Sequence, residues 1–159
     1  MTGIEIVCML WLVCPTYIEK GSGLATHYGK YHHGKLMANQ EPFNMYDKTL
    51  ASRHIKKNRW VRVSSKENSI WCLSTDRGPY GAYLESGERV QRMHKKDGVW
   101  KVKPFDKKVW ITYSKKPGKY RGLTDLSLGC KRALTGVYKG RPPNLQVKLQ
   151  ILDTRIRYE

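Results

Sequence analysis

Residues 60–80 read WVRVSSKENSIWCLSTDRGPY, and this stretch decides the fold. Apolar and polar side chains alternate over residues 60–63, and a second β-type run covers residues 69–74. Such runs indicate half-buried strands, and the short polar turn at residues 66–68 between them predicts a β-hairpin. The hairpin leads into the sequence DRGP at residues 76–79, whose glycine and proline favour a rigid turn.

Short runs of the same kind lie on both sides of this hairpin. Residues 24–28 predict a strand, residues 99–102 and 109–113 predict a second hairpin, and the alternating LQVKLQIL at residues 145–152 predicts a closing strand. One short helix is expected over residues 125–134. Its cap would be Asp125 or Thr124, and its inward-facing residues would be Leu126, Cys130, Ala133 and Leu134. Many short strands with one helix indicate a compact barrel.

The chain is strongly basic. Its 159 residues include 30 Lys and Arg against 13 Asp and Glu, which gives a formal net charge of +17. The length suits one domain. A field of this sign attracts polyanions, such as nucleic acid, an anionic membrane, or the phosphates and carboxylates of a bacterial envelope. A basic surface that only confers solubility is the alternative.

The cysteines and histidines do not predict a metal site. Four cysteines stand at positions 8, 14, 72 and 130, without a CxxC pair and without a Cys/His spacing typical of zinc modules. Disulfides and free buried thiols both remain open. A glycine-rich phosphate loop is also missing from the sequence, so we expect neither a metal nor a cofactor.

The first residues form a separate apolar segment. Residues 4–13 (IEIVCMLWLV) are too short to span a bilayer, and no Lys or Arg precedes them. We therefore assign residues 1–20 to an N-terminal segment, either a degenerate signal or a docking arm, and residues 21–159 to the barrel domain. No transmembrane span is expected.

Several motifs in order resemble the rare lipoprotein A and expansin-like barrel family. They are GLATHYG at residues 23–29, HGKLMANQEPFNMY at 33–46, DRGPY at 76–80 and TDLS at 124–127. The resemblance implies a mainly β fold: a six-stranded double-psi β-barrel with one short helix and an inserted basic β-hairpin. Because the DRGP and DLS motifs should converge at one end of the barrel, we also expect Cys72 and Cys130 to lie near one another.

The resemblance also implies a catalytic site that cleaves glycan strands. Asp76 of the DRGP turn would be the general acid, with Glu41 and Asp125 as helpers. Cleaving a glycosidic bond requires a proton for the leaving oxygen, and burial raises the pKa of a carboxylic acid so that it can supply one. In the family's lytic transglycosylases the sugar's own 6-hydroxyl then attacks, which leaves a 1,6-anhydro end. The expected substrate contacts are Tyr28, Arg77, Tyr80, Ser52 and His54.

Some positions depart from the family pattern. Ser52 stands where glycan-cleaving members often have histidine, and His54 lies two residues later. Asn44 replaces a common aspartate, and Thr75 replaces the asparagine that usually precedes DRGP. These departures leave the barrel intact and bear on catalysis.

Residues 81–120 are inserted between the DRGP and DLS motifs. They hold eleven Lys or Arg against four Asp or Glu. One interpretation is a wall that deepens the groove and attracts an anionic envelope; another is a docking arm for other proteins of a larger assembly. A solvated basic face is the third.

Three classes of function follow. The first is a lytic transglycosylase that acts on peptidoglycan glycan strands in the periplasm, at the cell envelope or outside the cell, for instance on a phage virion. The second is a non-catalytic, expansin-like glycan-binding module. The third is a structural component of an assembly such as a phage tail. Specific nucleic-acid binding ranks last, because no recognition motif accompanies the charge.

Overall fold

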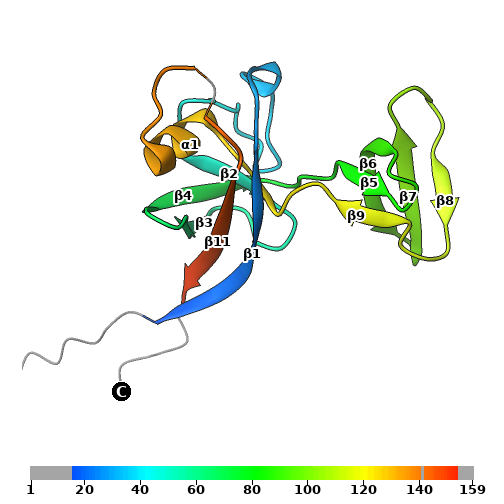
Figure 1. Cartoon of the computed structure of the whole chain (residues 1–159), viewed down its shortest axis with the longest axis horizontal. Coiled ribbons are helices and arrows are strands. Elements are labelled where there is room, and N and C mark those ends of the chain that lie inside the picture. The colour runs from blue at the N-terminus through cyan, green and yellow to red at the C-terminus, as the bar shows by residue number, and fades with distance from the viewer. Residues whose placement is uncertain (1–15, 141, 154–159) are drawn as a thin grey trace, which may run out of the picture.

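The computed structural model describes residues 16–140 and 142–153. Six strands close a barrel, and a separate five-stranded sheet lies beside it (Figure 1). Around the barrel the order is β1 (Tyr17–His27), β10 (Thr124–Leu126), β2 (Thr49–Ser52), β4 (Ser69–Asp76), β3 (Arg59–Ser64) and β11 (Leu145–Leu152). A short 3-10 helix, η1 (Lys30–His32), follows β1. No helix in the described part of the chain is long and apolar enough to cross a membrane.

The barrel combines parallel and antiparallel pairs. β3 and β4 form the predicted hairpin, with Val61 opposite Cys72, and β11 closes the barrel between β1 and β3. β1 runs parallel to β10, and β2 runs parallel to β4. Alternate residues of each strand point inward, which explains the buried core of Ala25, Leu50, Val61, Val63, Leu126, Val147 and Leu149. The fold is therefore the mainly β, six-stranded barrel that the sequence predicted.

The inserted segment is larger than the predicted hairpin. It forms a sheet in the order β8 (Ile111–Tyr113), β7 (Val99–Pro104), β6 (Arg89–Lys96), β5 (Ala82–Leu84) and β9 (Gly118–Tyr120). The pairing of β7 with β8 confirms the second hairpin. β6 escaped prediction because its sequence, RVQRMHKK, buries only Val90 and Met93, and a bulge breaks the alternation between them.

The helix begins later than predicted. α1 spans Leu128–Thr135, and Ser127 caps it by accepting a hydrogen bond from the backbone N–H of Cys130. The expectation that Thr124 or Asp125 caps the helix is wrong, because both residues belong to β10. That strand pairs with β1 on one side and β2 on the other. Two of the predicted inward residues, Cys130 and Leu134, are buried as expected.

One disulfide joins the barrel to the helix. Cys72 of β4 bonds Cys130 of α1, with their Cα atoms 6.5 Å apart, which confirms the predicted proximity. The other two cysteines lie outside the described residues, as does most of the N-terminal segment. β1 already begins at Tyr17, so residues 17–19, which the sequence analysis assigned to that segment, pair with β11 in the barrel.

Two short connections carry the chain out to the inserted sheet and back (Figure 1). The backbone N–H of Arg121 donates to the carbonyl of Gly81 at 2.9 Å, which ties one connection to the other. The guanidinium of Arg53 donates to the carbonyls of Pro79 and Gly122 and lies 3.7 Å from the ring centroid of Tyr120. Barrel residue Arg53 thus holds both connections.

Candidate functional site

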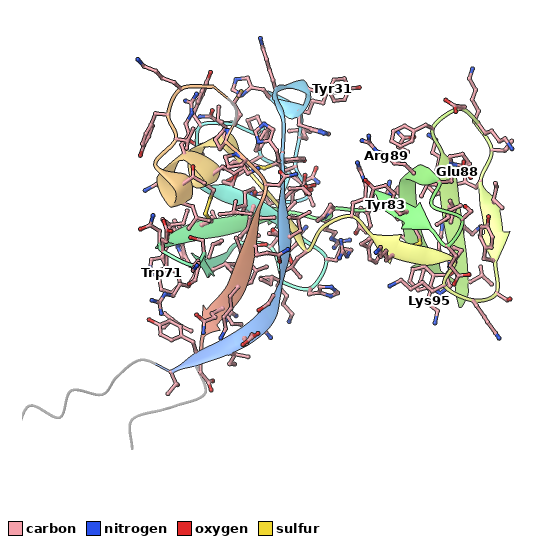
Figure 2. All side chains as sticks on the ribbon, in the orientation of Figure 1. Tyr31, Trp71, Tyr83, Glu88, Arg89 and Lys95 are labelled. Carbon is pink, nitrogen blue, oxygen red and sulfur yellow. A yellow bond between two sulfur atoms is a disulfide. The ribbon has the colours of Figure 1, made fainter. Side chains whose placement is uncertain are left out.

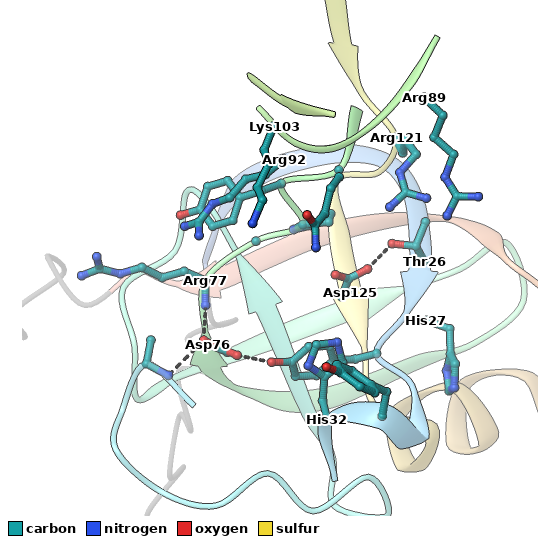
Figure 3. Close-up of a pocket in the computed structure, with 18 of the residues that line it drawn as sticks. Thr26, His27, His32, Asp76, Arg77, Arg89, Arg92, Lys103, Arg121 and Asp125 are labelled. Carbon is teal, nitrogen blue, oxygen red and sulfur yellow. Dashed lines mark hydrogen bonds between the residues drawn. The ribbon is translucent and has the colours of Figure 1, made fainter. Parts of the chain in front are cut away.

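A groove of about 910 Å³ lies between the barrel and the inserted sheet (Figure 3). The ends of β1, β4 and β10 and the DRGP turn form its barrel side, and β6 and β7 form the other side. Five of the residues proposed from the sequence line it: Tyr28, Asp76, Arg77, Tyr80 and Asp125. Motifs separated by almost fifty residues, DRGP and DLS, therefore meet here.

Asp76 ends strand β4, and three donors hold its carboxylate. One oxygen accepts hydrogen bonds from the backbone N–H groups of Ala38 at 2.9 Å and Arg77 at 2.8 Å. The other oxygen accepts the phenol O–H of Tyr28. Hydrogen bonds on both oxygens fix the carboxylate plane, so Asp76 is oriented before any ligand binds.

Tyr28 follows β1 and stands against two other rings. Its ring centroid lies 4.4 Å from that of Phe43 and 4.6 Å from that of His32. Burial raises the pKa of the Tyr28 phenol far above its ordinary value, and the neighbouring Asp76 raises it further. The phenol therefore stays protonated and remains a donor to Asp76.

Asp125 lies in the middle of β10, deeper than Asp76. Burial raises the pKa of its carboxyl group. A hydrogen bond from the Thr26 hydroxyl and the nearby cations Arg121 and Arg53 oppose that rise. The groove thus contains two carboxyl groups in different surroundings, one buried and one held by backbone donors. Such a difference can separate acid and base roles.

The sequence analysis missed His32 as a groove residue. It belongs to η1, lines the groove and stacks on Tyr28. Burial lowers the pKa of His32, and Lys35 lowers it further, so the imidazole is neutral near pH 7. The signal that could have found His32 is its place in the loop after GLATHYG, which returns to Asp76.

Three residues proposed from the sequence do not line the groove. Glu41 is exposed in the loop beside it, where its carboxylate accepts the Asn39 side-chain amide at 3.0 Å. Ser52 is buried, and its hydroxyl accepts the backbone N–H groups of His54 and Ile55. His54 lines a second pocket with Tyr80. Neither Ser52 nor His54 therefore lines the groove with Asp76.

The described residues do not form a recognisable metal centre. Across residues 16–140 and 142–153, no three His, Cys, Asp or Glu side chains are grouped so that they could hold an ion. The chemistry available in the groove is that of carboxyl groups, imidazole, phenol and cationic side chains.

The closed six-stranded barrel, with its parallel pairs β1–β10 and β2–β4, is consistent with a double-psi β-barrel. Over part of its length the chain is similar to RlpA proteins. Over 64 residues it is 36% identical to the endolytic peptidoglycan transglycosylase RlpA of Helicobacter pylori, a match that covers 39% of this chain and 20% of the relative. Over 61 residues it is 38% identical to the endolytic peptidoglycan transglycosylase RlpA of Vibrio cholerae. That match covers 37% of this chain and 23% of the relative. The match spans about a fifth of the length of these curated relatives. No family model matches the chain.

Proposed function

We propose that this protein cleaves peptidoglycan glycan strands in the groove as a lytic transglycosylase. The observation that carries the proposal is the presence of Asp76 and Asp125 in one groove of an RlpA-like barrel. The names of the similar proteins, endolytic peptidoglycan transglycosylases, supply the substrate class and the reaction.

The two aspartates would divide the proton transfers. Asp125, whose pKa is raised by burial, donates its proton to the glycosidic oxygen as the bond from that oxygen to C1 breaks. The Asp76 carboxylate stabilises the positive charge that develops at C1. The 6-hydroxyl of the same sugar then attacks C1 and gives its proton to Asp76, which leaves a 1,6-anhydro end without water. The sequence analysis assigned the general acid to Asp76 with Asp125 as a helper, and the burial of Asp125 favours giving the acid role to Asp125 instead.

Aromatic side chains on the groove walls would hold the sugar rings. Tyr31, Tyr80 and Trp110 line the groove, and Tyr31 is 79% exposed although the Lys35 ammonium lies 3.2 Å from its ring centroid. Tyr28 has a different part: its phenol holds Asp76, and His32 supports the Tyr28 ring. His32 and Tyr28 are therefore positioning residues in this proposal.

The proposed location is a bacterial envelope, the extracellular space or a virion acting on that envelope. The Cys72–Cys130 disulfide supports an oxidising compartment. The net charge of +17 supports attraction to an anionic wall.

The direct test is incubation of the purified protein with peptidoglycan sacculi, followed by mass spectrometry for 1,6-anhydro muropeptides. Asp76→Asn and Asp125→Asn should each lower release at least about a hundredfold, the low end for loss of a general acid or base. Asp106→Asn is the matched control, because Asp106 is exposed in the inserted segment outside the groove. Full release by either groove variant would sink the proposed roles.

The second candidate is a non-catalytic, expansin-like glycan-binding module. The specific observation in its favour is Ser52, which is buried and occupied in a turn where the family often has histidine. The same assay separates the two functions. A parent protein that binds sacculi and releases no anhydro product is a binding module, and one that does neither supports the structural-component interpretation.

A further inference from the structure

Two cations stand directly opposite each other on the inserted sheet. Arg92 of β6 and Lys103 of β7 are register partners, so their side chains project from the same face. Both line the groove, and Figure 3 shows them across it from Asp76 and Asp125. Like charges at facing positions of a sheet destabilise it. The fold therefore keeps an unfavourable pair at this place.

No carboxylate in the described residues compensates the pair. Within residues 16–140 and 142–153 the one ion pair closer than 4.0 Å joins Lys148 to Glu19, on the barrel. Arg92 instead lies with its guanidinium 4.8 Å from the ring centroid of Tyr80. The cations that act on the Asp125 carboxyl are Arg121, Arg53 and Lys131, and neither member of the pair is among them. The pair thus does not serve to balance that aspartate.

A second pair of cations continues the same wall. Arg89 of β6 and Arg121 both line the groove, and Arg89 lies on the barrel side of the inserted sheet (Figure 2). Burial lowers the pKa of Arg121, and the repulsion between the Arg89 and Arg121 guanidinium groups lowers it further. With Arg77 included, five Lys or Arg side chains line the groove against two carboxyl groups. The groove therefore presents a surplus of positive charge to its ligand.

We propose that Arg92 and Lys103 form an anion subsite that holds a carboxylate carried by the glycan strand. The proposal rests on the proposed function, since the glycan is the substrate class inferred above. A guanidinium and an ammonium side by side suit a carboxylate, which can bridge them and relieve their repulsion. Two sources share this chemistry: the lactyl carboxylate of a peptide-free muramic acid and the carboxylates of a peptide stem.

Binding measurements test the subsite separately from catalysis. Isothermal titration in an Asp76→Asn background would compare a neutral N-acetylglucosamine oligomer, peptide-free glycan strands and peptide-bearing strands. We expect Arg92→Gln/Lys103→Gln to weaken binding of a carboxylated strand at least about tenfold, which corresponds to 1.4 kcal/mol. Binding of the neutral oligomer should change less than about twofold. Whichever carboxylated strand loses more affinity identifies the source of the carboxylate.

The control is Lys107→Gln/Lys108→Gln. These two lysines are exposed in the loop of the same insertion and lie outside the groove, and their replacement removes the same charge. An equal loss with the control pair would overturn the proposal, because a general field would then explain the affinity. Equal losses for neutral and carboxylated strands, or no loss at all, would overturn it too.

A single variant separates binding from folding. Lys103→Glu places a carboxylate opposite Arg92, so we expect a higher melting temperature together with loss of carboxylated-glycan binding. A structural role for the pair predicts that the melting temperature falls with the affinity. Absence of anhydro product from the parent protein would count against the transglycosylase function alone, since none of these binding measurements requires turnover.

Discussion

Replacing Ser127 with alanine should destabilise the protein through one buried hydroxyl. The Ser127 oxygen accepts the backbone N–H of Cys130 at 3.1 Å, which caps α1, and the N–H of Thr49 at 3.2 Å. The hydroxyl donates to the carbonyl of Asp47 at 2.5 Å. Ser127 is fully buried, so water does not replace these partners when the hydroxyl is removed.

The loss of unfolding free energy in Ser127→Ala depends on which hydrogen bonds the partners of Ser127 retain. Loss of a serine cap costs about 0.5–2 kcal/mol, and full burial favours the upper half of that range. The Thr49 N–H and the Asp47 carbonyl still bond each other at 3.0 Å, so each loses only its second partner. That adds about 1 kcal/mol, for a total of about 2–3 kcal/mol. In a chain of this length the melting temperature should fall by roughly 4–12 °C.

Urea and thermal unfolding followed by circular dichroism would measure the loss. Ser65→Ala is the matched control, because the Ser65 hydroxyl also makes two hydrogen bonds, both to Asn68, in an exposed turn. That variant should lose no more than about 1 kcal/mol, because water can replace the bonds. Equal losses for the two variants, or a loss below about 0.5 kcal/mol for Ser127→Ala, would refute the reasoning from buried partners.

Three further predictions concern the groove. Burial raises the pKa of Asp125 in the folded state, so its ionisation opposes folding at any pH above its unfolded-state pKa of about 3.9. Asp125→Asn should therefore be more stable than the parent at pH 7. In urea titrations this difference in stability should vanish below about pH 4. Tyr28→Phe removes one donor from Asp76 and should lower anhydro-product release about 10- to 100-fold while sacculus binding is kept, as measured by mass spectrometry and pull-down. In a sedimentation assay the affinity of the protein for sacculi should fall steadily as the salt concentration rises. The reason is that exposed cations are screened beyond about 8 Å at physiological ionic strength. Binding that does not change with salt would mean that charge does not drive the association.

The sequence predicted the strands whose pattern alternates and missed those whose pattern does not. The hairpin of β3 and β4 and the closing strand β11 alternate clearly, and both are present where expected. Residues 124–126 resemble a helix start because a cap-forming Thr-Asp pair precedes apolar residues. They form a strand because β1 and β2 offer backbone partners on both sides. That choice depends on tertiary contacts, which local propensity does not contain.

The sequence predicted the residues on the barrel side of the candidate site but not those on the side formed by the inserted sheet. Tyr28, Asp76 and Asp125 stand in recognisable motifs, and the barrel's closure brings them to one groove. The opposite wall depends on a bulge in β6, which changes the register so that Arg92 pairs with Lys103. Without that bulge a strict alternation would shift the pairing by one residue and turn different side chains toward the groove. Charge counts of the insertion therefore predicted that this wall is basic, whereas the identity of its cations required the pairing of the strands.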